Sequence, residues 1–340
     1  MTVQSHPPLP DELAHVSEQW WEDFCQAAET AAVRPPKDPA IIQAIKRVWA
    51  HSEFVARSCQ RDPNLLHDLV TSGDLTRQYA PNEFAAKLAA ALHPVVVSIA
   101  RDAKDAATAP DTDPMGTLQQ ILRQQRKREM VRVAFRDIQG LADLDATVTD
   151  LSSLADALID QTLNCLYEWQ CLRDGIPRSR DGIQQQLVVL GLGKLGGHEL
   201  NFSSDVDLIF AYPEAGQTDS PANPLSNDVF FARLAQRLVK ALGAVTVDGF
   251  VFRVDLRLRP DGDNGPLVMS FDNMETYYQS QGREWERYAL IKARVVAGDQ
   301  TAGRRLLTML QPFVYRRYLD YGVFNALRDM KQKIAFEVKR

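Results

Sequence analysis

The stretch GLGKLGGHELNFSSDVDLIFAY, residues 191–212, decides the predicted fold because it joins two apolar runs through a glycine-rich turn. Leu187–Leu192 leads into the turn and is almost wholly apolar, and Asp205–Tyr212 supplies the second apolar run. Short runs rich in β-branched and aromatic residues, bounded by turn residues, are typical of buried strands. We therefore expect two buried strands on either side of the glycine turn.

The turn formally matches two nucleotide-binding motifs but satisfies neither. Gly191–Gly196 has the GxGxxG spacing of a dinucleotide fingerprint. Too few residues lie between Gly197 and the strand at Asp205 for a parallel crossover with its helix, which needs at least about ten to twelve residues. A Walker loop requires Ser or Thr after its lysine, and leucine follows Lys194 instead. Both motifs are therefore rejected.

What remains is a candidate phosphate-binding turn. Glycines leave backbone amides uncovered, so a triphosphate can approach them closely, and neighbouring hydroxyl groups can add hydrogen bonds. A Gly-Gly pair shortly before an Asp-x-Asp motif is a specific combination, whereas glycines alone would indicate only a tight turn. The candidate ligand-binding residues of this turn are Lys194, Gly196, Gly197, Ser203 and Ser204.

Two aspartates, Asp205 and Asp207, stand two residues apart at the start of the second predicted strand. Such residues project from the same face of a strand, about 7 Å apart along the chain. Neighbouring carboxylates repel each other unless a cation neutralises them, so the pair is a candidate site for a divalent metal. A solvated acidic surface is the alternative, because exposed acidic pairs are common.

A third carboxylate is predicted on a separate strand. Apolar and charged residues alternate along Phe250–Arg259, which is the period of a strand with one apolar and one charged face. Asp255 then shares its face with Arg257 and Arg259, whose guanidinium groups suit phosphate oxygens. If this strand lies beside the first, Asp255 completes a three-carboxylate cluster suited to two Mg²⁺ ions and to phosphoryl or nucleotidyl transfer. A solvent-exposed, salt-bridged strand face is the alternative.

Most of the remaining chain is predicted to be helical. Residues 1–175 read as a helical bundle, and the four-residue spacing of apolar side chains over Asn227–Leu242 predicts a helix that packs on the sheet. The dipeptide Asp248-Gly249 is a hairpin turn signal.

Helix is predicted again over Tyr277–Val296 and from Arg304 onward. Within the first of these helices, Lys292 or Arg294 is a candidate nucleotide contact, although an exposed, salt-bridged helix is equally consistent with the spacing. The predicted class is α+β. Its predicted parts are a helical N-terminal region at 1–175, a catalytic core at 176–270 and a C-terminal helical region at 271–340.

Composition excludes several classes of protein. Of the 340 residues, 45% are hydrophobic and 24% are charged, which argues against a disordered or fibrous chain. The net charge of −5 and the lack of a basic stripe give no reason to expect a nucleic-acid partner. No signal peptide or membrane span is recognisable, and the four cysteines form no CxxC pair, so a cytoplasmic location without membrane contact is expected.

Together, the motifs resemble those of the DNA polymerase beta-like nucleotidyltransferase superfamily, whose pattern is a Gly-Gly or Gly-Ser turn, a strand Asp-x-Asp and a third strand carboxylate. More closely, residues 193–216, 254–271 and 277–299 resemble the bifunctional glutamine synthetase adenylyltransferase/adenylyl-removing family. That family has two catalytic units in tandem, and ELNFSS at 199–204 resembles the N-terminal, AMP-removing unit. The resemblance implies a nucleotidyltransferase sheet core flanked by helical regions, and a chain that corresponds to an N-terminal fragment.

The resemblance also implies a reaction in nitrogen metabolism. Inorganic phosphate attacks the AMP phosphorus of adenylyl-tyrosine on glutamine synthetase and releases ADP. The expected cofactor is Mg²⁺, with Mn²⁺ as an alternative, and the expected partners are adenylylated glutamine synthetase, uridylylated nitrogen regulatory protein PII, phosphate and ADP or ATP. The site residues that it implies are Asp205, Asp207 and Asp255 as metal ligands, and Gly196, Gly197, Ser204, Arg257 and Arg259 around the phosphates.

Two alternatives stay open on the sequence. One is forward adenylyl transfer from ATP to a protein or a small molecule. The other is a non-catalytic module that senses nucleotide or binds a signalling protein through its helical lead-in. Such a module would not need all three aspartates.

Overall fold

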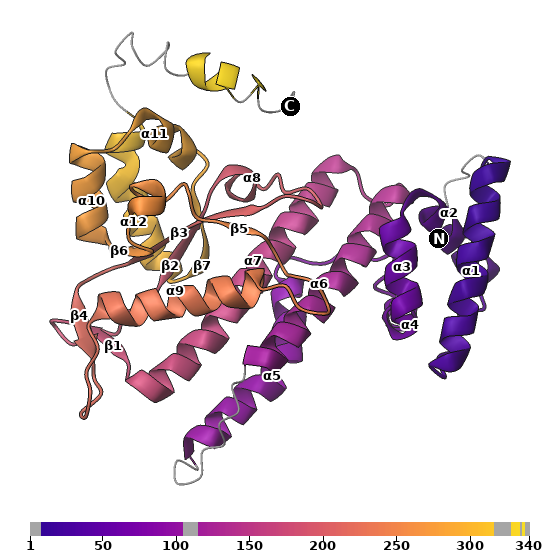
Figure 1. The fold of residues 1–340 in the computed structure, drawn as a ribbon, viewed down its shortest axis with the longest axis horizontal. Helices are drawn as coiled ribbons and strands as arrows, with labels where there is room; N and C mark the ends of the chain where they lie inside the picture. The colour runs from indigo at the N-terminus through magenta and orange to yellow at the C-terminus, as the bar shows by residue number, and fades with distance from the viewer. Residues whose placement is uncertain (1–7, 105–114, 316–327, 334, 337–340) are drawn as a thin grey trace.

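The structure, a computed structural model, describes residues 8–104, 115–315, 328–333 and 335–336. The described residues before Gly175 form seven helices, and a helical N-terminal region is what the sequence predicts (Figure 1). Side chains of Asp38, Ser52 and Asp143 cap three of them by accepting hydrogen bonds from backbone amides of the first turn. The helices are α1 (Asp11–Thr30), α2 (Pro39–His51), α3 (Glu53–Arg61), α4 (Pro63–Thr71), α5 (Glu83–Lys104), α6 (Met115–Ile138) and α7 (Leu144–Asp174).

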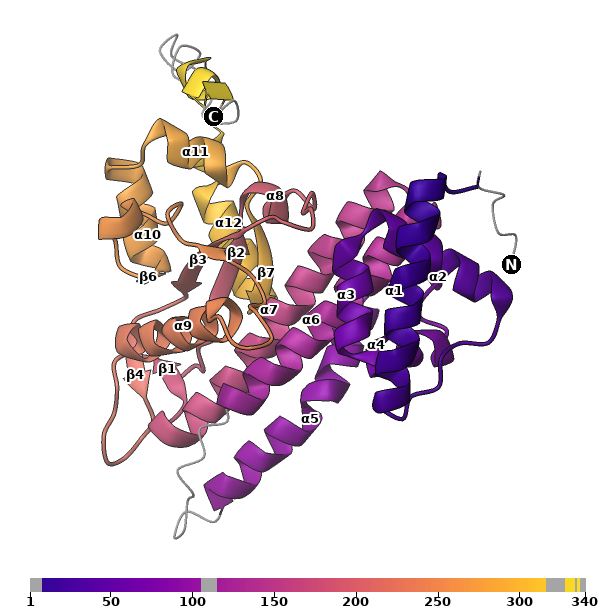
Figure 2. The same cartoon turned by 45° about the vertical axis from the view of Figure 1, so that its right-hand side comes forward.

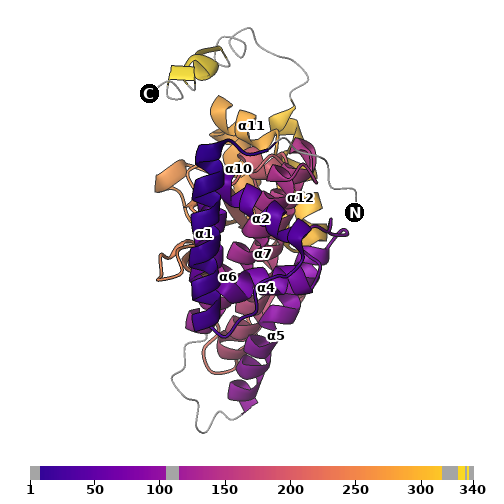
Figure 3. The same ribbon diagram turned by 90° about the vertical axis from the view of Figure 1, so that its right-hand side faces the viewer.

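The first four helices pack around their own apolar cluster. Phe24 of α1 and Trp49 of α2 are buried with their ring centroids 5.4 Å apart, and Phe135 of α6 closes the cluster from the other side. Figure 3 shows α1, α2 and α4 in front of α6, with α5 running away from them. These aromatics are core residues of the helical region.

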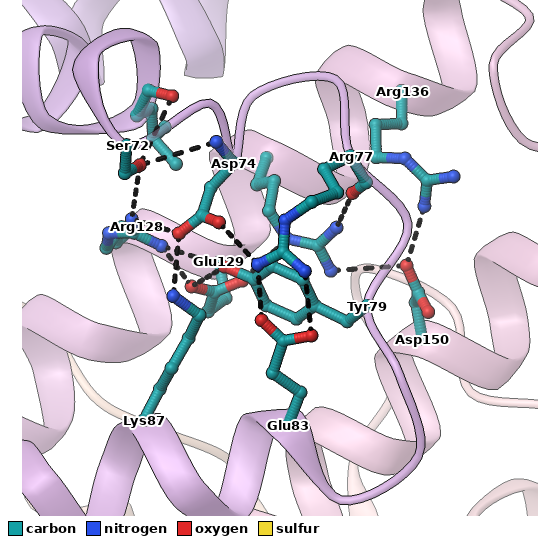
Figure 4. Close-up of polar contacts among 12 residues, drawn as sticks. Ser72, Asp74, Arg77, Tyr79, Glu83, Lys87, Arg128, Glu129, Arg136 and Asp150 are labelled. Carbon is teal, nitrogen blue, oxygen red and sulfur yellow. Dashed lines mark hydrogen bonds and ion pairs between the residues drawn. The ribbon is translucent and has the colours of Figure 1, made fainter.

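A buried polar network ties the loop after α4 to α5 and α6 (Figure 4). The side chain of Asp74 is 1% exposed and accepts hydrogen bonds from Arg77, Lys87 and Arg128, each at 2.8 Å. Because each cation comes from a different segment of the chain, the carboxylate acts as a junction between them.

The remaining elements build a five-stranded mixed sheet with the order β5-β3-β2-β7, in which β6 also pairs with β3. β2 is antiparallel to both of its neighbours, and β3 is parallel to β5 and β6. The antiparallel β2–β3 pair agrees with the rejection of a dinucleotide fold, which needs a parallel crossover. The strands are β2 (Val188–Gly191), β3 (Val206–Tyr212), β5 (Val254–Asp255), β6 (Val268–Ser270) and β7 (Arg294–Gly298), and a separate ribbon pairs β1 (Pro177–Ser179) with β4 (Gly216–Thr218).

Helices cover both faces of the sheet (Figures 1 and 2). Val189 and Phe210 pack in the same core as Leu163 of α7 and Phe230 of α9, so this core crosses the predicted boundary at residue 175. The other face packs on α10 and α12. The helices of this part are α8 (Gly193–Gly196), α9 (Asn227–Gly243), α10 (Phe271–Ser280), α11 (Glu284–Leu290) and α12 (Gln300–Val314).

The two buried strands, the helix over Asn227–Leu242 and the α+β class are confirmed. Helix α12 confirms helix near Arg304, whereas residues 316–327 lie outside the described residues. Within the described residues, no helix combines the length and the apolar character needed to cross a bilayer.

The predicted helix over Tyr277–Val296 is correct only in part. The chain there forms α10, a break, α11 and then strand β7. The break lies at Gly282, where a Cβ atom would come within 2.5 Å of the Phe313 ring. Val295 and Val296, whose branched side chains suit a strand, continue the sheet beside β2.

The predicted strand over Phe250–Arg259 is also wrong in extent. Only the two residues of β5 pair with β3, because the chain after Leu256 folds back: the amide of Arg259 donates to the Leu256 carbonyl and the amide of Gly262 donates to the Arg259 carbonyl. The predicted turn at Asp248-Gly249 is present. A single β-bridge between Thr246 and Gly249 closes it, but it does not connect two strands.

Candidate active site

The backbone of the glycine turn lies against Asp207, one of the predicted site aspartates. Gly193 has a positive φ of 55°, and a Cβ atom there would lie 2.5 Å from Oδ2 of Asp207. Only glycine fits this position without moving the carboxylate. Gly193 was not among the predicted site residues, although the GLGKLGG spacing contains it.

The next glycine has a packing role. A Cβ atom on Gly196 would lie 2.1 Å from the carbonyl oxygen of Lys292, which follows α11. The Nζ of Lys292 donates to Glu199 at 2.6 Å, and its Cδ would lie 3.2 Å from a Cβ atom on Gly197. The structure therefore brings Lys292 to the glycine turn, although it stands on no helix. Lys194, also in this turn, is exposed.

The two serines of the turn hydrogen-bond within it. Ser204 Oγ donates to Oδ1 of Asn201 at 2.7 Å, and Ser203 Oγ donates to the same oxygen at 3.3 Å. This is a common arrangement in turns that begin with asparagine. Asn201 was missed by the sequence analysis, although an asparagine two and three residues before serines was a usable signal.

The three aspartates lie at one end of two adjacent strands. Asp207 of β3 and Asp255 of β5 are directly opposite each other in a parallel pair, and adjacent strands lie about 4.8 Å apart. Asp205 precedes β3, and the amide of Val206 beside it donates to the carbonyl of Arg253 at 3.0 Å. The predicted adjacency of the two acidic strands is therefore present.

The surroundings of Asp207 disfavour its negative charge. Burial, together with the neighbouring charges of Asp255 and Asp205, raises the pKa of Asp207 to about 6, and Arg257 and Lys194 partly oppose this rise. Among the described residues, no side chain or amide donates a hydrogen bond to its carboxylate. Asp207 is thus a partly buried acid next to two other acids.

Each of the other two aspartates forms an ion pair with an arginine. Arg253 Nε contacts Asp205, and its Nη2 donates to the Ser203 carbonyl at 2.7 Å. The side chain and backbone amide of Arg257 both donate to Asp255, so the pKa of Asp255 is lowered. In the described part of the chain, no three His, Cys, Asp or Glu side chains lie close enough to hold a metal ion in this arrangement.

Arg259 does not lie on the same face as Asp255. Its guanidinium donates to the backbone carbonyls of Leu256 at 2.9 Å and Asp263 at 3.2 Å, and its side chain is 13% exposed. In this structure, its hydrogen bonds therefore close the loop after β5.

Arg294 joins the glycine turn to the helical region. Its guanidinium binds both carboxylate oxygens of Asp156 on α7, at 2.7 and 2.8 Å, and donates to the Leu195 carbonyl within the turn. Arg294 was predicted to lie on a helix, and Asp156 was not among the predicted site residues, because no local pattern relates residues so far apart in the chain.

Comparison with known proteins identifies relatives of this chain. A family model described as glutamate-ammonia ligase adenylyltransferase matches residues 42–309. Curated relatives named bifunctional glutamine synthetase adenylyltransferase/adenylyl-removing enzyme include one from Nitrosococcus oceani, 52% identical over 86% of this chain, and one from Thioalkalivibrio sulfidiphilus, 54% identical over 88%. One from Hahella chejuensis is 44% identical over 100% of this chain. The chain spans 29% of the length of the first two relatives and 33% of the third.

Proposed function

We propose, because this chain belongs to the glutamate-ammonia ligase adenylyltransferase family, that it carries a nucleotidyltransferase site that removes AMP from glutamine synthetase. The names of the relatives combine adenylyl transfer with adenylyl removal. The likeness of residues 199–204 to the AMP-removing unit favours removal. In the proposed reaction, a phosphate oxygen forms a bond to the AMP phosphorus, the bond to the tyrosine oxygen breaks, ADP leaves, and a proton ends on the tyrosine.

The observation that supports this proposal most directly is the pairing of Asp207 with Asp255 on adjacent parallel strands. Burial and two acidic neighbours raise the pKa of Asp207, and no cation neutralises its carboxylate by direct contact in the described residues. An acid in such surroundings is a candidate functional group, because a structural acid normally has a partner.

We infer that the three aspartates hold Mg²⁺, or alternatively Mn²⁺. Their donor atoms are carboxylate oxygens, which both ions accept. A bound divalent ion would reduce the repulsion between the phosphate nucleophile and the phosphodiester. In this proposal, Asp205 releases Arg253 and Asp255 releases Arg257. Both carboxylates then bind the ion.

The released arginines then have a place in the proposed site. Arg253 and Arg257 are 58% and 74% exposed. Each is paired with one carboxylate, and Arg253 also donates to the Ser203 carbonyl, so in this proposal both turn toward phosphate oxygens when the carboxylates bind the ion. Because Gly193 has no side chain, its backbone lies directly against the Asp207 carboxylate. Adenylylated glutamine synthetase, phosphate, ADP or ATP and uridylylated PII are the proposed partners.

The test is phosphate-dependent ADP release from adenylylated glutamine synthetase in the presence of Mg²⁺. We expect the chain to release ADP, and we expect Asp205→Asn or Asp207→Asn to abolish the release. Asp272→Asn, on the exposed first turn of α10, makes the same charge change away from the site and is the control. Full turnover by either site variant would refute the assignment of these aspartates.

A regulatory module is the second candidate, because arginines already occupy Asp205 and Asp255. A module of this kind would bind nucleotide with unchanged affinity after Asp207→Asn and would show no metal-dependent turnover. Forward transfer is separated from removal by supplying ATP and unmodified glutamine synthetase without phosphate. AMP attached to the protein under these conditions would favour transfer.

A further inference from the structure

A pocket of about 490 Å³ lies between α3, α6 and the turn at residues 246–250. It is separate from the three aspartates. Five of its lining side chains are cationic and one, Asp248, is acidic. The cations are Arg57 and Arg61 of α3 and Arg123, Arg126 and Lys127 of α6.

Arg126 is the least compensated of the cations that are not exposed. Its Nε is buried without a hydrogen-bond partner in the described part of the chain, and its guanidinium lies 5.7 Å and 5.6 Å from the ring centroids of Phe250 and Phe252. Burial lowers the pKa of Arg126, and no acidic group opposes that effect. A partly buried charge without an ionic partner is unfavourable unless something else compensates it.

The other cations differ in how they are held. Arg123 is committed to the fold, because its guanidinium donates to the carbonyls of Gly249 at 2.8 Å and Ala241 at 3.3 Å and also contacts Ala244 at the end of α9. Lys127 lies 4.0 Å from Asp248. Arg61 is exposed and has no hydrogen bond or ion pair with any described residue. Arg61 and Arg126 are therefore free to bind a ligand.

We propose that this pocket binds a small phosphate-bearing anion. Guanidinium groups from two helices converge on one hollow, and planar guanidinium groups suit the several oxygens of a phosphate. The pocket is concave and the Nε of Arg126 in its lining is buried, which favours a small molecule over a flat protein surface. Phe54 and Phe250 add aromatic walls beside the cations.

The pocket adjoins the segment that carries one of the site aspartates. The turn at 246–250 continues directly into Val251, which is fully buried, and then into β5 with Asp255. A ligand that binds this turn therefore contacts the same stretch of chain as the proposed active site, from the opposite end.

The test measures binding of inorganic pyrophosphate and of ADP to the 340-residue chain by isothermal titration calorimetry in EDTA. EDTA keeps divalent ions from the three aspartates. We expect Arg61→Glu to weaken pyrophosphate binding by at least about tenfold, because it replaces attraction with repulsion. We expect Arg126→Gln to remove the rise in Tm that pyrophosphate causes in the wild type. Arg304→Glu, an exposed site on α12, makes the same charge change as Arg61→Glu and is the control.

The outcomes are distinct. Similar affinities for pyrophosphate and ADP would support a site that reads phosphate alone, and tighter ADP binding would support a nucleotide that also uses the aromatic walls. Absence of pyrophosphate and ADP binding by the wild type would overturn the proposal, as would equal binding by wild type and Arg61→Glu. Binding of polyglutamate without either phosphate compound would overturn it in favour of an acidic protein surface. If Arg126→Gln does not fold, the exposed Arg61→Glu still decides.

Discussion

Asp74 in the helical region is buried and Asp207 at the end of the sheet is partly buried, and their surroundings shift their pKa values in opposite directions. Burial acts to raise the pKa of Asp74, but hydrogen bonds from Lys87, Arg128 and Arg77 hold that pKa well below its usual range. Burial also raises the pKa of Asp207, and there two acidic neighbours act in the same direction. The comparison separates an acid that joins structural elements from an acid that is suited to binding a cation.

The largest predicted effect concerns catalysis. Replacing Asp207 by Asn should lower ADP release from adenylylated glutamine synthetase by about a thousandfold or more, equivalent to about 4 kcal/mol of transition-state stabilisation. Replacing Asp74 by Asn should leave the rate per folded molecule within about twofold. Initial rates with Mg²⁺ and phosphate measure both. Equal losses of rate in the two variants would remove the contrast between them.

The next effect concerns stability. Asp74→Asn leaves Arg77, Lys87 and Arg128 without their shared carboxylate, so we expect it to lower the free energy of unfolding by about 2–3 kcal/mol, since two of these cations are partly exposed. Urea denaturation followed by circular dichroism measures the change. Asp68→Asn, which removes only an exposed partner of Arg128, should cost less than about 1 kcal/mol.

The contribution of Asp74 should depend on pH. Its pKa is lower in the folded chain than the ordinary value of 3.8, so the stabilisation is fully present above the unfolded pKa and is lost as the pH falls through the folded pKa. The difference in unfolding free energy between wild type and Asp74→Asn should therefore be constant from about pH 5 to 8 and shrink below about pH 4. A difference that grows on acidification would contradict this assignment.

A smaller effect of opposite sign is expected at the acidic end of the sheet. In EDTA at pH 8, Asp207→Asn removes one of three neighbouring carboxylates and should raise the free energy of unfolding by about 1 kcal/mol. Addition of Mg²⁺ should then stabilise the wild type more than the variant. Destabilisation by Asp207→Asn in EDTA would show that this carboxylate serves the fold.

The smallest effect is expected for Arg257. Its side chain is 74% exposed, so its ion pair with Asp255 should contribute less than about 0.5 kcal/mol to stability. Arg257→Ala should therefore leave the Tm within about 2 °C of the wild type. Differential scanning fluorimetry is sufficient, and a larger fall would indicate that the pair supports β5.

Parts of the fold could be predicted because their signals are local. The apolar runs of β2 and β3 and the stripe of α9 identify themselves over a few residues. By contrast, β7 is a strand only because β2 offers it a partner, and its Arg-Val-Val-Ala-Gly sequence fits the end of a helix equally well. The proximity of Asp255 to Asp207 was expected from a strand that is mostly absent, and two residues of pairing are enough to provide it.

In the candidate site, too, the features with local signals could be predicted and those that depend on distant residues could not. The aspartates, the glycine turn and Lys292 could be chosen from residue type and spacing. The engagement of Asp205 by Arg253, the contact of Gly193 with Asp207 and the clamp between Arg294 and Asp156 depend on side-chain directions and long-range packing. The periodicity of the sequence does not indicate such long-range contacts.

The position of β7 in the sheet also determines how long one edge of β2 stays unpaired while the chain is being translated. Val188 of β2 pairs with Gly298, roughly 110 residues later, so at about 5–20 residues per second the ribosome needs on the order of 5–20 s to deliver the partner strand. Until then, the apolar edge of β2 is an open template for pairing with other chains. Translation speed through residues 192–298 should therefore influence how much of the newborn protein escapes aggregation.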